Sequence, residues 1–138
     1  MGAWGEKPFE NDSALDWLGD LGEVADLRNT LSSVADAVDY LDVDDGSAAI
    51  AAAEIVAAAG DGELGRLATD ASAWLGQHGK EIVDSDRALA VRAVERVLGS
   101  DSELAALWDE GDTDNEWRRD VAGLVARLVA PRAEKPLK

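Results

Sequence analysis

The sequence predicts an all-α protein, a compact bundle of about six to seven helices around a buried alanine-rich helix. Three observations lead to this prediction. Residues 47–59 are apolar on every side except at Glu54, which is typical of a helix in the middle of its domain. Elsewhere, apolar residues recur at spacings of three and four. No segment shows the alternation of a half-buried strand.

The first half of the chain predicts three helices. The cluster Asn11, Asp12 and Ser13 can cap the free amides of a first turn, so a helix is expected over residues 12–20. A stripe of apolar residues then predicts an amphipathic helix of about five turns. Its members are Val24, Leu27, Leu31, Val34, Val38 and Leu41. The buried alanine-rich helix follows, with Asp44 and Asp45 at its amino end and a loop from Gly60 to Gly65 after it.

The second half predicts four further helices separated by glycine or capping residues. A short helix opens at Asp70 and stops after His78, and another starts at Ser85 and Asp86 and stops at Gly99. Ser102 begins the next helix. The last one presents Trp117, Val121, Leu124, Val125 and Leu128 on one side. Pro131 and Pro136 indicate a frayed tail over residues 131–138.

The chain of 138 residues has the size of one domain, so a single all-α domain is expected over residues 1–138. The N-terminal segment 1–11 is expected to pack on the bundle. Gly2 and Gly5 flank Trp4 and permit a tight turn, and Phe9 precedes the helix cap, where it can form a hydrophobic staple. The alternative is that Trp4 and Phe9 cover a ligand pocket.

Several short segments are similar to a known family. The opening Gly2-Ala3-Trp4-Gly5 and the pairs Asn11-Asp12 and Asp16-Trp17 resemble the start of the bacterial family catalogued as domain of unknown function 4259. Later segments with the same likeness are Tyr40-Leu41-Asp42, Ala93-Val94-Glu95-Arg96-Val97-Leu98, Asp101-Ser102-Glu103-Leu104 with Trp108, and Glu116-Trp117-Arg118. Lys7 and Pro8 depart from the pattern, which has a glycine shortly before the aromatic residue. The resemblance implies a small stand-alone domain and no particular activity.

The charge of the chain limits the classes of partner. With 29 acidic against 13 basic residues, the net charge is −16, which repels nucleic acids and anionic lipid surfaces and attracts basic proteins. The absence of cysteine excludes disulfides and thiolate chemistry. No signal peptide and no apolar run of membrane-spanning length is present, so a cytoplasmic protein without a membrane partner is expected.

Three carboxylates are the main candidates for partner binding. Asp12, Asp16 and Asp20 are spaced at four-residue intervals, which places them on one face of the first predicted helix. Like charges at this spacing destabilise a helix slightly, and a basic partner or a divalent cation would relieve them. The alternative is that the three carboxylates form a solvated acidic face. The candidate partner site therefore consists of Asp12, Asp16 and Asp20, together with Trp4 and Phe9.

Glu54 is the one charged residue of the predicted buried helix, and an isolated carboxylate there is costly unless it finds a partner. One expectation is an internal salt bridge with an arginine, such as Arg92, Arg96 or Arg118. A second is a position at a solvent-facing edge. A third is a cavity shared with Asp16 and Asp44, in which the three carboxylates hold Mg²⁺ and activate a water molecule.

These observations favour a non-enzymatic protein-interaction module, similar in role to an immunity protein or antitoxin, which uses its acidic surface to cover a basic partner and needs no cofactor. The alternatives are a hydrolase dependent on a divalent metal, built on Asp16, Asp44 and Glu54, and a structural homo-oligomer. Nucleophile and nucleotide-binding signatures are absent from the sequence. The oligomeric state stays open.

Overall fold

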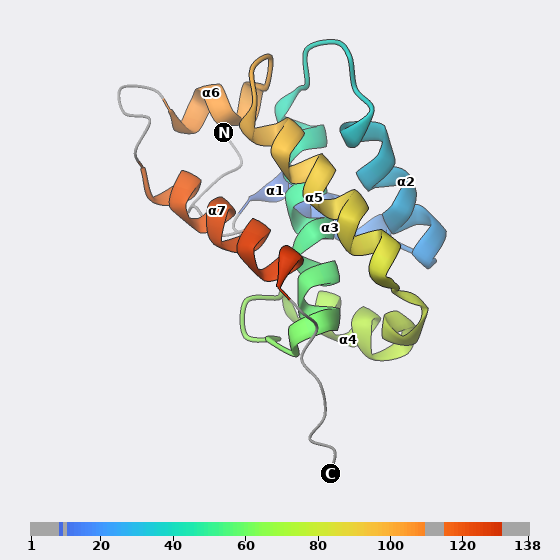
Figure 1. Ribbon diagram of the computed structural model, residues 1–138. Helices are drawn as coiled ribbons and strands as arrows, with labels where there is room; N and C mark the ends of the chain where they lie inside the picture. The colour runs from blue at the N-terminus through green and yellow to red at the C-terminus, as the bar shows by residue number, and fades with distance from the viewer. Residues whose placement is uncertain (1–8, 10, 110–114, 131–138) are drawn as a thin grey trace.

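The computed structural model describes Phe9 and residues 11–109 and 115–130 (Figure 1). Over these residues the chain forms seven α-helices and one 3₁₀ turn, which confirms the all-α prediction. In chain order they are α1 (Asp12–Asp20), α2 (Val24–Ala35), α3 (Val43–Asp61), α4 (Thr69–His78), η1 (Gly79–Glu81), α5 (Asp84–Leu98), α6 (Glu103–Trp108) and α7 (Glu116–Val129). None of the helices within this part of the chain is both long and apolar enough to cross a membrane.

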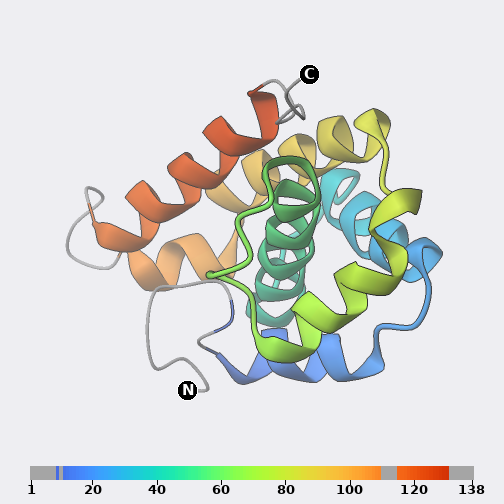
Figure 2. The same ribbon diagram turned by 90° about the horizontal axis from the view of Figure 1, so that it is seen from below.

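Helix α3 is the axis of the bundle. In Figure 2 it lies at the centre of the view with other helices arranged around it, and it contacts all six other α-helices. Its residues from Gly46 to Ala58 are all buried. Because most of them are alanines, the neighbouring helices can approach closely, while Ile50, Ile55 and Val56 fill the larger spaces. The predicted buried alanine-rich helix is therefore confirmed.

The amino ends of α1 and α3 lie against each other. Asn11 caps α1, because its side-chain oxygen accepts the N–H of Ala14 at 2.7 Å. Asp42 caps α3 by accepting the N–H of Asp45 at 2.9 Å, so the cap lies ahead of the two aspartates that the sequence indicated. Asp44 instead accepts a hydrogen bond of 2.6 Å from the Ser13 hydroxyl. This bond joins the first turns of α1 and α3.

Helix α2 is shorter than predicted. It ends at Ala35, and Val38, which was expected on its apolar stripe, is 90% exposed. The Arg96 guanidinium on α5 donates to the carbonyls of Ala37 and Asp39, which favours a non-helical path for this segment. Leu41 is buried as expected, but it is not part of a helix. Its N–H donates to the carbonyl of Asp101 and its carbonyl accepts the N–H of Glu103, each at 2.8 Å.

Two further boundaries, the end of α3 and the start of α5, differ from the predicted ones. Helix α3 continues through Asp61 and ends at Gly62, which adopts φ +77°, a conformation that favours glycine. The predicted loop therefore begins two residues later than expected. Helix α5 begins at Asp84, and the Asp86 carboxylate accepts the N–H of Val83 at 2.9 Å. The predicted stops after His78 and at Gly99 and the predicted Ser102 cap are confirmed.

The core is continuous around α3. It includes Leu27 and Leu31 of α2, Val94 and Val97 of α5, and apolar residues of α7. Phe9 belongs to it and is 7% exposed. Trp4, the other aromatic residue singled out in the N-terminal segment, lies outside the described residues, as does the predicted tail 131–138.

The close packing of α3 gives a first prediction. Replacing Ala52, which is 0% exposed, with leucine should lower the free energy of unfolding by about 1–3 kcal/mol, because a fully packed site cannot hold the added atoms without strain. Urea unfolding measures this difference. The Ala122→Leu variant, on the exposed side of α7, is the matched control and should unfold like the parent protein. Equal stability of the two variants would contradict the tight packing of α3.

Candidate functional site

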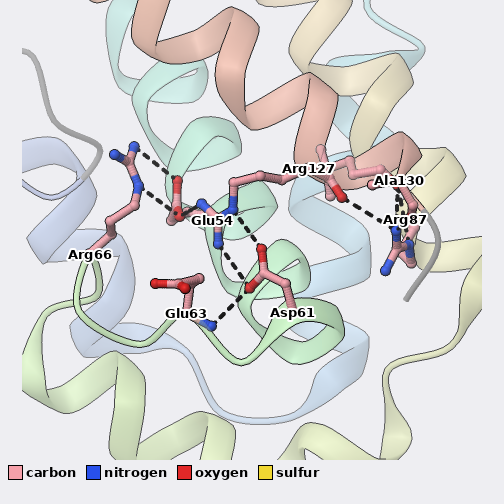
Figure 3. Close-up of polar contacts among 8 residues, drawn as sticks. Glu54, Asp61, Glu63, Arg66, Arg87, Arg127 and Ala130 are labelled. Atoms are coloured by element: carbon pink, nitrogen blue, oxygen red, sulfur yellow. Dashed lines mark hydrogen bonds and ion pairs between the residues drawn. The ribbon is translucent and has the colours of Figure 1, made fainter. Parts of the chain in front are cut away.

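Glu54 lies at the centre of a buried ion network. Its carboxylate is 0% exposed and accepts hydrogen bonds from two guanidinium groups (Figure 3). Arg66, on the loop after α3, bonds through Nε at 3.1 Å, and Arg127 on α7 bonds to the same carboxylate oxygen. The salt-bridged state predicted for Glu54 is thus confirmed, and a solvent-facing edge is excluded.

Each arginine of this network also holds a second carboxylate. Arg66 donates to Asp120 of α7 at 2.8 Å, and Arg127 donates to Asp61 at the end of α3 at 2.7 Å. The order of groups is Asp120, Arg66, Glu54, Arg127 and Asp61, which together we call the Glu54 network. Since every acid faces a guanidinium, the burial cost of Glu54 is offset by charge-assisted hydrogen bonds. The network fastens α7 and the loop after α3 to the axis.

The prediction that Arg92, Arg96 or Arg118 would pair with Glu54 was wrong. Arg92 pairs with Asp36, Arg96 holds backbone carbonyls at the end of α2, and Arg118 pairs with Asp109. Arg118 and Arg127 are nine residues apart on α7, about 13 Å along its axis, so only one of them can reach Glu54. A sequence signal for the observed partner exists. Two turns separate Glu54 from Asp61 and also Asp120 from Arg127, so each pair shares a helix face.

The three carboxylates proposed as metal ligands are not brought together. Asp16 is exposed on α1, and Asp44 is engaged with Ser13 at the start of α3. Glu54 follows Asp44 by ten residues on the same helix, which separates them by about 15 Å. Within the described part of the chain, no three histidine, aspartate or glutamate side chains are grouped so as to hold a metal ion.

The arginines of this protein are used internally. The eight that lie in the described segments all contact a carboxylate or a backbone carbonyl of the same chain. They are Arg28, Arg66, Arg87, Arg92, Arg96, Arg118, Arg119 and Arg127. Arg87 is typical, because it is buried and donates to the carbonyls of Leu128 and Ala130 at the end of α7 (Figure 3). The guanidinium groups of the described residues are thereby engaged within the fold, whereas many acidic side chains are left exposed at the surface.

Exposed acidic residues of the predicted partner site lie on α1, and further ones lie at the start of α3. Asp12, Asp16 and Asp20 are all exposed on α1, as predicted from their spacing. Asp42, Asp44 and Asp45 are exposed on the first turn of α3, which the Ser13–Asp44 bond holds beside α1. We call these six residues the acidic face. Across the described residues, none of the six forms a salt bridge.

A groove of about 480 Å³ adjoins the acidic face. It lies between α1, α2, residues 37–41 and the start of α3, and its lining includes Trp17, Thr30, Asp39, Tyr40, Leu41 and Asp45. The Trp17 indole donates to the Thr30 hydroxyl at 2.8 Å, which fixes the wall between α1 and α2. Tyr40 is 61% exposed. Sequence reasoning missed this groove, because it exists only where α2 stops short of its predicted end.

The surroundings of Asp45 disfavour the ionised form of its carboxyl group. Partial burial raises the pKa of its carboxyl above the ordinary value, and the neighbouring charges of Asp42 and Asp44 raise it further. Partial burial and the charges of Asp42 and Asp44 thus favour the neutral form of Asp45 over the ionised form. A positive group placed at this end of the groove would reverse that preference.

The fold and these sites define a small all-α domain in which a buried carboxylate–arginine network supports an acidic, grooved exterior. The chain belongs to the family described as Domain of unknown function (DUF4259), whose family model matches residues 2–120. The family resemblance read from the sequence is thereby confirmed. None of the curated proteins and none of the solved structures gives a match.

The Glu54 network gives a second prediction. The Glu54→Gln variant keeps the shape of the side chain but removes the buried negative charge between Arg66 and Arg127, so it should lose about 3–5 kcal/mol of unfolding free energy. The Asp36→Asn variant breaks the exposed pair with Arg92 and should lose less than about 1 kcal/mol. Urea unfolding of both compares them. If Glu54→Gln loses no more unfolding free energy than Asp36→Asn does, the network does not have this stabilising role.

A third prediction concerns the acid sensitivity of Asp61. Burial alone would raise the pKa of Asp61, but hydrogen bonds from Arg127 and from the backbone of Glu63, with the charges of Arg127 and Arg87, lower it. The stability that Asp61 contributes is therefore complete above its unfolded pKa of about 3.9 and is lost as pH falls through its lower folded pKa. The Asp61→Asn variant should be less stable than the parent at neutral pH.

The measurement is urea unfolding of both proteins as a function of pH. The stability difference between parent and Asp61→Asn should shrink as the solution becomes more acidic than about pH 4. A difference that stays constant down to about pH 2 would show that the ionised carboxylate is not what stabilises this corner of the fold.

Proposed function

We propose that this protein is a non-enzymatic interaction module that binds a basic protein partner through its acidic face, in the manner of an immunity protein or antitoxin. The single observation that carries the proposal is the distribution of charge. The described arginines are engaged within the fold, whereas the carboxylates of the acidic face are exposed and form no salt bridge there. A partner with a basic surface would supply the missing counter-charges.

The physical basis is electrostatic steering followed by local pairing. A net charge of −16 creates a long-range field that raises the rate of encounter with a basic protein at low salt. Exposed charges are screened over about 8 Å at physiological ionic strength, so the association should weaken as salt is added. The aspartates of the acidic face also have short side chains, which lose little rotational freedom on binding.

The buried Glu54 carboxylate supports this proposal over a hydrolytic role. Both of its oxygens are occupied by guanidinium donors, so its lone pairs are engaged within the protein. Self-association through the acidic face is also unfavourable, because two copies would bring carboxylates of the same sign together. We place the module in the cytoplasm of a bacterial cell, where a basic partner such as a toxin could be covered as soon as it is made.

The fourth prediction tests the acidic face with a matched pair of variants. One carries Asp12→Asn, Asp16→Asn and Asp20→Asn, and the control carries Glu63→Gln, Glu95→Gln and Glu116→Gln, which removes three exposed acids elsewhere. Each is used as bait for proteins of its source organism, and the captured proteins are identified by mass spectrometry. The parent and the control should retain the same basic protein at low salt and release it at high salt, and the α1 variant should not retain it.

Two results would overturn the proposal. The first is that the parent captures no salt-sensitive basic protein. The second is that the α1 variant captures the same protein as well as the control does, since Asp12, Asp16 and Asp20 would then contribute nothing beyond total charge. A captured partner is then purified, and its dissociation constant is measured by calorimetry for all three proteins.

A further inference from the structure

The groove beside the acidic face has the composition of a site for one basic side chain. Its volume of about 480 Å³ falls within the range of roughly 300–1,000 Å³ that is usual for ligand sites. It combines two carboxylates, Asp39 and Asp45, with two aromatic side chains, Trp17 and Tyr40. This inference rests on the proposed function and makes it more specific. We propose that the groove receives an arginine side chain of the basic partner.

Carboxylates and aromatic rings together favour a guanidinium over an ammonium group. A guanidinium is planar and weakly hydrated, so it can lie against an aromatic ring while its N–H groups bond a carboxylate in a bidentate manner. An ammonium group is a compact, strongly hydrated charge and gains less from the rings. Trp17 and Tyr40 therefore select for arginine, and Asp45 supplies the counter-charge.

Asp45 is available for this role. Its backbone N–H is used in the cap of α3, but its carboxylate forms no salt bridge with any cation in the described segments. Its pKa is raised by partial burial and by the charges of Asp42 and Asp44. Burial and the two neighbouring charges oppose the favourable interaction of this carboxylate with the amino end of α3, so removing its charge should cost the fold little.

The wall formed by residues 37–41 is held in place before any ligand binds. Arg96 donates to the carbonyls of Ala37 and Asp39 at 3.1 and 2.7 Å from the α5 side. The backbone of Leu41 pairs with Asp101 and Glu103, each at 2.8 Å. The Glu103 carboxylate accepts the N–H of Val43 at 2.8 Å. Since these bonds fix both ends of the segment, little ordering cost is left for binding.

The charge of the chain also identifies the kind of molecule that brings the arginine. A second copy of this protein carries the same net charge of −16 and would be repelled by the acidic face that borders the groove. The exposed Val38 and Tyr40 at the rim provide apolar area that a free amino acid would leave uncovered, whereas a protein surface would cover it. The occupant is therefore an arginine presented by a basic protein.

The test is a ¹H–¹⁵N NMR titration of the full chain with a blocked peptide, acetyl-Gly-Arg-Gly-amide. The Trp17 indole N–H, which is hydrogen-bonded to Thr30, reports on the groove directly. The arginine peptide should shift this signal and the amides of residues 37–41 in a saturable manner. A peptide with citrulline in place of arginine, which has the same shape without the charge, should cause no shift, and a lysine peptide should bind several times more weakly.

Three variants complete the experiment. Asp45→Asn should weaken binding of the arginine peptide by about tenfold or more, while its urea unfolding midpoint stays equal to or above that of the parent. Tyr40→Ala should weaken binding, because Tyr40 is exposed and its ring contributes to the ligand and not to the core. Glu95→Gln, which removes an exposed acid on α5, should bind like the parent.

The proposal is overturned if the arginine peptide leaves the Trp17 indole signal unmoved, if citrulline shifts it equally, or if Asp45→Asn binds like the parent. These outcomes are distinguishable from failure of the proposed function. If the bait experiment retains a basic partner and the groove ignores arginine, the acidic face acts without the groove. If the groove binds arginine and no basic protein is captured, the interaction role itself is wrong.

Discussion

Helix α3 is buried on every side from Gly46 to Ala58, and the rest of the fold depends on covering this stretch. A helix of this kind cannot remain exposed to water, so neighbouring helices must be packed on all of its sides. The surrounding helices do this with ordinary amphipathic stripes. Glu54 is the one charged residue of this buried stretch, and it imposes a second constraint, because its charge requires counter-charges at a fixed depth. Arg66 and Arg127 meet this requirement from a loop and from the last helix, so one carboxylate sets the position of two distant segments.

The fold was largely predictable from the sequence, and the site was not. Caps at Asn11 and Ser102 and a stop at Gly99 are local signals, since each depends on side chains within a few residues of the helix end. The end of α2 is not local. Its apolar spacing continues to Leu41, but a guanidinium on α5, far along the chain, takes the carbonyls that a continued helix would use. The groove is a product of that long-range contact.

The partners of Glu54 show the same limit. A buried glutamate predicts an arginine, and this expectation is confirmed, but the choice among nine arginines depends on the angles at which the helices cross. The common face of Asp12, Asp16 and Asp20 was easier to predict, because it depends only on the residue spacing within one helix. Bringing their helix beside the start of α3 required the packing of α1 on α3, where the bond from Ser13 joins the two helices.

The position of Arg127 has a consequence for where this domain ends. The family model matches residues 2–120, and that limit falls inside α7, after Asp120 and before Arg127, Leu124 and Leu128. A fragment cut at the matched boundary would keep Glu54 but lose one of its two guanidinium partners and part of the apolar cover of α3. The last helix of the fold thus extends beyond the stretch that the family model matches. A shortened version of this chain should keep that helix complete if Glu54 is to retain both of its guanidinium partners.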